Sequence, residues 1–184
     1  SGWLSPARLC PSPNCDDRSV LKPVSLLVVH GISLPPAQFG GPFIDQLFCN
    51  QLRPEEHSYF AEIAHLRVSA HALIRRDGEL VQYVPLHARA WHAGRSCFEG
   101  CVDCNDFAIG VELEGTDELP YEAIQYRQLA SLYLSLLPHF PELNRQRVTG
   151  HSDIAPGRKT DPGPAFDWCE FDRQIAEQSM IGVC

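Results

Sequence analysis

Two runs of apolar residues predict the strands at the centre of the fold. Residues 24–30 are almost continuously apolar and rich in β-branched side chains, which is typical of a strand buried on both faces, and the run ends at His30. Residues 107–114 have the same character, but Glu112 lies inside the run. Because burying an unpaired polar group is costly, both polar residues become candidates for chemistry.

Shorter patterns predict the elements around these strands. Residues 68–74 and 80–84 flank Asp77-Gly78, and an Asp-Gly pair accepts the positive φ of a tight turn, so we expect a β-hairpin. Apolar residues three or four apart over 121–140 predict a helix with one apolar face. The remaining predicted elements are a short helix near Pro42, a short strand over 148–151 and a last helix over 167–178.

Two segments are predicted to be irregular. Residues 1–23 are rich in proline and suggest a wrapping arm, and residues 85–106 suggest one long, partly ordered loop. Together, the strands, helices and hairpin predict a single domain over residues 1–184. Its expected class is α/β (mixed α+β), with a central mixed β-sheet flanked by helices.

The composition limits the partners that this chain can have. The 184 residues carry a formal net charge of −8 with a pI near 5.4, which disfavours nucleic acid and anionic membranes. No apolar run approaches the roughly 18–20 residues of a membrane span, and no apolar signal segment is visible near the start. We therefore expect a cytoplasmic protein with neither nucleic-acid nor membrane partners. We also expect a monomer, although the composition does not reveal the oligomeric state.

Eight cysteines leave three interpretations open: disulfides, a metal site, or free thiols. Without an export signal, reduced thiols are favoured. Cys97, Cys101 and Cys104 have the spacing of radical enzymes that bind a four-iron cluster through three thiolates. Those enzymes are usually larger barrels, and Asp103 stands where they tend to have an aromatic residue. A zinc ribbon would need a second cysteine pair of suitable spacing, which the sequence lacks.

Two histidines and two acids have the chemistry of a catalytic metal site. His30, His151 and Asp161 supply two imidazoles and a carboxylate, a ligand set that leaves the fourth position of zinc to water. Glu112 could then act as the base for that water, and the Lys159 ammonium could stabilise an oxyanion. No compact motif such as H-E-x-x-H is present. Spacing alone therefore leaves open a core histidine, a solvent-facing carboxylate and a polar turn.

Six longer runs carry a resemblance that covers most of the chain. They are SLLVVHGISLPP (25–36), SAHALIRRDG (69–78), AWHAG (90–94), CNDFAIGVELEGTD (104–117), GHSDIAP (150–156) and RKTDPG (158–163). These runs resemble the zinc amidases of bacterial cell-wall recycling. That family of N-acetylmuramoyl-L-alanine amidases is related to phage lysozyme-type amidases and to peptidoglycan recognition proteins.

The resemblance implies a role for each of the candidate residues. His30, His151 and Asp161 would hold one catalytic Zn²⁺, Glu112 would be the general base, and Lys159 would stabilise the transition state. It also implies a set of substrate contacts: Arg67, Trp91, His92 and Asn105. The chain departs from the family pattern at two positions, because Gly31 replaces an asparagine beside the first ligand and Asp103 replaces a basic residue. Both departures put contacts to the substrate in doubt and leave the metal chemistry intact.

The implied activity is hydrolysis of the lactyl amide bond between 1,6-anhydro-N-acetylmuramic acid and the first L-alanine of a stem peptide. The partner would be an anhydro-muropeptide substrate. Two alternatives stay open: an exported amidase that acts on intact peptidoglycan, and a non-catalytic peptidoglycan-binding module.

Overall fold

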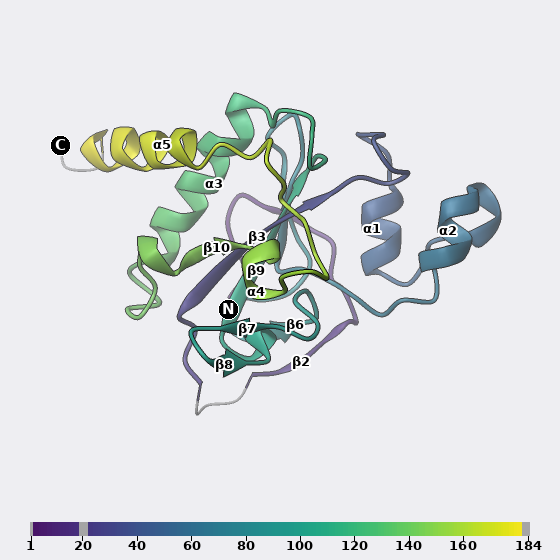
Figure 1. Cartoon of the computed structure of the whole chain (residues 1–184), viewed down its shortest axis with the longest axis horizontal. Coiled ribbons are helices and arrows are strands. Elements are labelled where there is room, and N and C mark those ends of the chain that lie inside the picture. The colour runs from purple at the N-terminus through teal and green to yellow at the C-terminus, as the bar shows by residue number, and fades with distance from the viewer. Residues whose placement is uncertain (1, 19–21, 182–184) are drawn as a thin grey trace.

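A six-stranded mixed sheet lies at the centre of the computed structural model, which describes residues 2–18 and 22–181 (Figure 1). The order across the sheet is β1 (Arg8–Leu9), β5 (Leu80–Gln82), β4 (Ala72–Ile74), β9 (Ala108–Glu114), β3 (Leu26–Ile32) and β10 (Val148–Gly150). β4 and β5 run antiparallel as the predicted hairpin, and the other neighbouring pairs are parallel. The structure confirms the mixed α/β class and the central mixed sheet.

The two predicted central strands are the neighbours β3 and β9. Successive side chains of a strand point to opposite faces, so Leu27 and Val29 pack into one core while His30 faces the other side. The parallel register pairs His30 with Glu112, which places both polar side chains on the same face. β3 continues to Ile32 because its pairing with β9 continues, so the prediction that the strand ends at the histidine was wrong.

Two long helices cover one face of the sheet, α3 (Ala123–Leu136) and α5 (Trp168–Ile181), and Figure 1 shows them side by side. Leu129 and Phe171 are fully buried between these helices and the strands. Complete burial of one such side chain contributes roughly 1.5–3 kcal/mol. Both helices confirm their predictions with shifted ends. Among the described residues, no helix combines the length and apolarity needed to cross a membrane.

Two short helices cover part of the opposite face, α1 (Phe43–Phe48) and α2 (Ser58–Ile63). α1 confirms the helix expected near Pro42. Neither α2 nor the preceding 3-10 turn η1 (Pro54–Glu56) was predicted. α2 has six residues and buries only Phe60, so no helical period is visible in its sequence.

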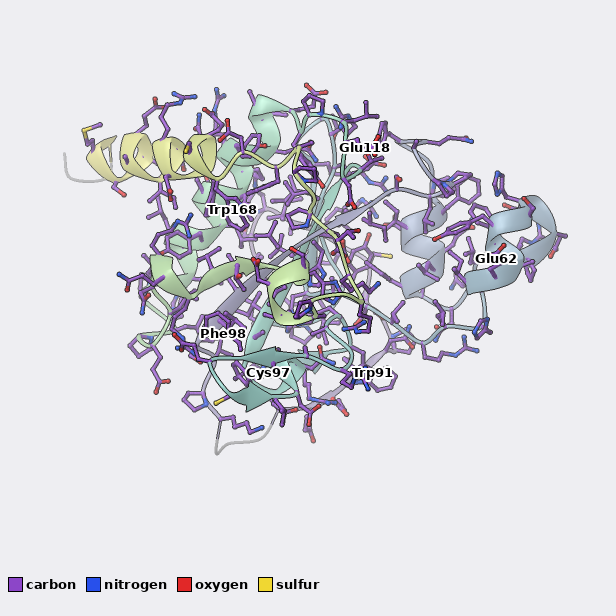
Figure 2. All side chains as sticks on the ribbon, viewed as in Figure 1. Glu62, Trp91, Cys97, Phe98, Glu118 and Trp168 are labelled. Atoms are coloured by element: carbon purple, nitrogen blue, oxygen red, sulfur yellow. The ribbon has the colours of Figure 1, made fainter. Side chains whose placement is uncertain are left out.

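The rest of this face is covered by the segments that were expected to be irregular. β1 joins the central sheet, and β2 (Cys15–Asp17) pairs with β6 (Ala88–Ala90). β7 (Cys97–Phe98) and β8 (Cys101–Val102) form a small hairpin that leads into the 3-10 turn η2 (Cys104–Asp106); Figure 2 labels Cys97 and Phe98 there. Both segments therefore contain short strands that were not predicted, although most of their described residues are irregular as expected. Strands of two or three residues leave no period in a sequence, and their partners are far away along the chain.

The part of the arm prediction that falls on residues 1 and 19–21 lies outside the described residues, as do the last three residues of the predicted domain.

The expected strand over 148–151 also needs a correction. β10 ends at Gly150, and His151 begins the short helix α4 (His151–Ile154). The Asp153 carboxylate accepts the Gly150 N–H at 2.9 Å, and this bond starts the helix one residue early.

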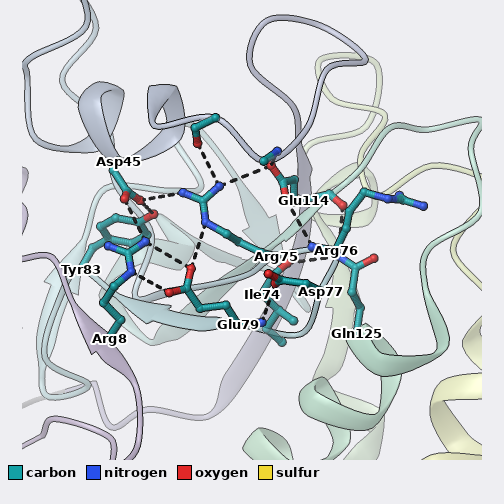
Figure 3. A network of polar contacts seen from close by, with 12 residues as sticks. Arg8, Asp45, Ile74, Arg75, Arg76, Asp77, Glu79, Tyr83, Glu114 and Gln125 are labelled. Atoms are coloured by element: carbon teal, nitrogen blue, oxygen red, sulfur yellow. Dashed lines mark hydrogen bonds and ion pairs between the residues drawn. The ribbon is translucent and has the colours of Figure 1, made fainter.

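A network of ion pairs ties α1 to the central sheet (Figure 3). The Arg75 guanidinium lies 3.3 Å from Asp45 on α1, 3.5 Å from Glu114 on β9 and 3.3 Å from Glu79. Glu114 in turn accepts the Gly40 N–H at 2.7 Å. Arg75 and Glu114 are both buried, so each charge depends on the other and on these hydrogen bonds. The network holds α1 and the loop before it over the sheet.

We predict that Arg75→Ala lowers the free energy of unfolding by about 3 kcal/mol or more, because it leaves Glu114 charged and buried without its partner. Urea unfolding measures this loss. The control is Arg53→Ala, whose guanidinium is 67% exposed beside Glu55 and Glu56 and should matter by less than about 1 kcal/mol. Equal losses in the two variants would contradict the role given to the network.

Candidate metal centre and active site

Three side chains from distant parts of the chain converge beside the end of β3. His30 Nδ1 lies 2.9 Å from His151 Nδ1 and 3.3 Å from Asp161 Oδ2, and His151 Nδ1 lies 3.1 Å from the same carboxylate oxygen. His30 comes from β3, His151 from the first residue of α4, and Asp161 from the loop that follows α4. Within the described part of the chain, these three residues are the group of side chains that could hold a metal ion, and we call them the metal-type group.

The donor set fits zinc. Metal–ligand bonds of about 2.0–2.1 Å at tetrahedral angles place neighbouring ligand atoms about 3.3 Å apart, close to the three separations seen here. Burial lowers the pKa of His30 to about 4, so its imidazole is neutral at pH 7 and can ligate a metal. Burial alone would raise the pKa of Asp161, but hydrogen bonds with His151 and His30 outweigh it and hold this pKa well below its usual range. Two imidazoles and one carboxylate are typical of catalytic zinc.

Glu112 lies beside this group with an unsatisfied carboxylate. Its side chain is 9% exposed, and Oε2 is buried without a hydrogen-bond partner among the described residues. Burial raises the pKa of Glu112 well above its usual value, the Asp161 charge raises it further, and the Lys159 charge opposes the rise. A buried, unpaired carboxyl group of raised pKa next to a metal-type group marks a candidate for proton transfer.

A cavity of about 600 Å³ opens above these residues. One side is polar and holds the metal-type group, Glu112 and Lys159. The other side is apolar, with a wall from the loop before α1, from α1 itself and from α2: Leu34, Pro36, Leu47, Phe48, Tyr59 and Ile63. The α2 part of this wall is a feature that the sequence did not indicate, since α2 itself was not predicted. The site therefore combines reactive polar groups with an apolar surface for a ligand.

The predicted substrate contacts fall into two groups. Trp91 and His92 line the cavity, and Figure 2 places Trp91 toward the same side of the molecule as the β7–β8 hairpin. Arg67 is exposed, lies outside the cavity wall and donates to the carbonyls of residues 64–66 at the end of α2. Asn105 is buried, and its Oδ1 accepts the main-chain N–H groups of residues 92 and 93. The structure therefore places only the first pair at the cavity.

The two departures from the family pattern also lie in different places. Gly31 lies on the cavity wall, and a Cβ atom there would overlap the Tyr121 hydroxyl, so the tyrosine fills the space of the missing side chain. Asp103 is exposed at the start of η2, with φ of 59°, and is not part of the cavity wall.

The cysteine cluster does not form a metal site. Cys97 and Cys101 are exposed on the β7–β8 hairpin, whereas Cys104 is buried. Within residues 2–18 and 22–181, the three thiols do not come together as a group that could hold an ion. The seven cysteines in this part of the chain are free thiols. The structure gives no support to the iron–sulfur interpretation.

Comparison with known proteins adds three findings. Residues 21–164 match the N-acetylmuramoyl-L-alanine amidase family. The chain is 57% identical over 178 residues to the 1,6-anhydro-N-acetylmuramyl-L-alanine amidase AmpD of Escherichia coli (strain K12), which covers 97% of both proteins. A crystal structure of a Se-Met AmpD derivative superposes with a TM-score of 0.92 at 58% identity, covering 95% of this chain and 97% of that one.

A more distant structure contains a ligand. It is the complex of the Escherichia coli N-acetylmuramyl-L-alanine amidase AmiD with the substrate anhydro-N-acetylmuramic acid-L-Ala-D-gamma-Glu-L-Lys. Its TM-score is 0.60 at 27% identity, and the match covers 86% of this chain and 60% of that one.

We predict that Asp161→Ala loses most of the metal affinity, because it removes one of three ligands and its charge. Metal analysis after dialysis against zinc should give about one ion per wild-type chain and much less than one for the variant. The matched control is Asp117→Ala, which removes a carboxylate of the same cavity wall outside the group of three and should keep zinc. Stoichiometric zinc in Asp161→Ala would remove Asp161 from the ligand set.

Proposed function

The chain belongs to the N-acetylmuramoyl-L-alanine amidase family, and on that premise we propose that it is a zinc-dependent hydrolase of anhydro-muropeptides. The bond cut is the lactyl amide between 1,6-anhydro-N-acetylmuramic acid and the L-alanine of the stem peptide. The observation that carries this proposal is the position of the unpaired Glu112 carboxylate beside the group of His30, His151 and Asp161, on the floor of a cavity. The names of the relatives supply the substrate class.

In this proposal His30, His151 and Asp161 hold one zinc ion. When bound, zinc supplies Lewis acidity, which makes water more acidic and polarises a carbonyl group. The other steps belong to side chains. Glu112 takes a proton from the attacking water and returns it to the departing alanine nitrogen. Burial raises the pKa of this carboxyl group, which makes its carboxylate a stronger base than an exposed one.

Lys159 has an electrostatic role in the same proposal. Its ammonium group lies at the polar side of the cavity, and its charge is felt by Glu112. A positive charge at this position stabilises the oxyanion that develops on the amide carbonyl. It also keeps the pKa of Glu112 from rising further, so that a larger fraction of the base is ionised at neutral pH.

The proposed substrate lies against the apolar wall. Trp91 also lines the cavity, is half-buried and offers an indole face to the sugar or its lactyl group. His92 lines the cavity as well and is more deeply buried. Arg67 would have to leave the carbonyls at the end of α2 to reach a substrate carboxylate. We therefore assign the substrate-binding role first to Trp91.

The proposed setting is a monomer that processes small diffusible fragments in the cytoplasm. The net charge of −8 supports this, because an acidic protein is repelled by anionic wall polymers. The alternatives are an exported amidase of intact peptidoglycan and a non-catalytic binding module. The site contains all the residues that the proposed chemistry needs, namely three metal ligands, a general base and a cation for the oxyanion. This complete set favours an enzyme over a binding module.

Paired substrates test the proposal directly. Purified protein should hydrolyse an anhydro-muropeptide at a rate well above that for the matching reducing-end muropeptide or for intact peptidoglycan, and a chelator should abolish the reaction. Chromatography and mass spectrometry of the released peptide measure both rates. Faster hydrolysis of intact peptidoglycan would favour the exported amidase, and hydrolysis of neither substrate would favour the binding module.

We predict that Glu112→Ala keeps zinc but lowers turnover at least about 100-fold, because general acid–base assistance is typically worth 10²–10⁴-fold. The control is Glu118→Ala, which removes an exposed carboxylate just beyond β9 and should not change turnover. Near-normal hydrolysis by Glu112→Ala would refute the assignment of the base.

A further inference from the structure

The two histidines of the metal-type group are held from behind by one short segment, residues 92–93. His30 Nε2 lies 2.9 Å from His92 Nδ1, on the side of the ring away from the metal position. His151 Nε2 lies 3.2 Å from the main-chain carbonyl of Ala93. Two neighbouring residues thus contact the outer nitrogens of both rings, while the inner nitrogens face each other and Asp161.

This arrangement determines where the protons lie on each ring. The carbonyl of Ala93 only accepts, so it favours the tautomer in which His151 carries its proton on Nε2 and offers a bare Nδ1 to a metal ion. If His30 is to offer a bare Nδ1 to the metal, it must also carry its proton on Nε2 and donate it to His92 Nδ1. His92 Nδ1 lies within hydrogen-bond distance of this nitrogen, and a neutral His92 ring with its own proton on Nε2 accepts the bond.

Residues 92–93 are themselves held in place by hydrogen bonds and by packing. Asn105 Oδ1 accepts both the His92 N–H at 3.1 Å and the Ala93 N–H at 2.8 Å. Arg158 donates to the Ala93 carbonyl at 2.6 Å. The His92 ring lies against Gly110 of β9, where a Cβ atom would overlap it. Side chain and main chain of the segment are therefore held from three directions.

We propose that residues 92–93, anchored by Asn105, are the positioning element of the metal centre, and that His92 acts through His30 rather than mainly on substrate. This rests on the proposed zinc site. Partners that orient ligating histidines typically change metal affinity by 10–100-fold when removed. Sequence reasoning placed His92 and Asn105 on the substrate side. It could not see the Ala93 carbonyl, because a main-chain group leaves no mark on residue identity.

Zinc affinity measured by competition with a chromophoric chelator tests the proposal without reference to hydrolysis. His92→Leu removes the acceptor and should weaken zinc binding by about 10–100-fold. His92→Asn places an amide oxygen near the position of Nδ1 and should restore affinity to within about threefold, whereas His92→Gln extends its amide towards Nε2 and should not. Asn105→Ala should weaken zinc binding by about tenfold, although this residue touches neither the metal position nor the cavity.

Two controls separate positioning from general damage. His139→Leu removes an exposed histidine, and Asn144→Ala removes another asparagine whose Oδ1 accepts a main-chain N–H; both should leave zinc affinity unchanged. Thermal unfolding identifies any variant that fails to fold. In the zinc-loaded wild-type protein, ¹⁵N NMR of the imidazoles should show protons on Nε2 of both His30 and His92, a measurement that needs no variant.

The outcomes distinguish this proposal from the proposed function. Equal zinc affinity in wild type and in folded His92→Leu, or a His92 ring protonated on Nδ1, would overturn the positioning role. Absence of zinc binding by the wild-type chain would overturn the metal centre and this proposal with it. Tight zinc binding without hydrolysis of anhydro-muropeptide would overturn only the proposed function.

Discussion

The parallel pairing of β3 with β9 is the constraint on which the site depends. It places His30 directly opposite Glu112 on one face of the sheet, in a strand pair whose other face is buried under α3 and α5. A shift of one residue in either strand would turn one of the two side chains into the apolar core, where an unpaired charge is costly. The apolar packing that fixes this register is therefore also what fixes the distance between the base and the metal-type group.

Two glutamates on β9 differ in the partners of their carboxylates and therefore in their roles. Glu112 and Glu114 point to the same face and are both buried. Glu114 is paired with Arg75 and accepts the N–H groups of Gly40 and Arg76, so its charge is fully compensated. Glu112 has one buried oxygen with no partner, and its pKa is raised. The first acid stabilises the fold and the second remains free to exchange a proton.

The sequence was informative where a segment carries its own signal and poor where the signal belongs to a distant partner. The long apolar runs, the Asp-Gly turn and the helix of 121–140 were recognisable because each has a clear period or turn residue. The short strands β1, β2, β6, β7 and β8 were not, since each is only two or three residues long and is defined by pairing. At the site, residues of unusual chemistry such as Glu112 could be picked out from their surroundings. The actual contacts of Arg67, His92 and Asn105 depend on the folded backbone, and so the structure alone reveals them.

The three metal-type ligands join β3, near the start of the chain, to the loop after α4, near its end. An ion bound there would act as a cross-link that closes a loop of most of the chain, and the stabilisation from such a link grows with loop length. Binding to the folded state alone would add about 4 kcal/mol when the free ion exceeds its dissociation constant a thousandfold. During synthesis the complete ligand set exists only after Asp161 has emerged. An ion could therefore complete its coordination only after β3, α4 and the loop that follows α4 have come together.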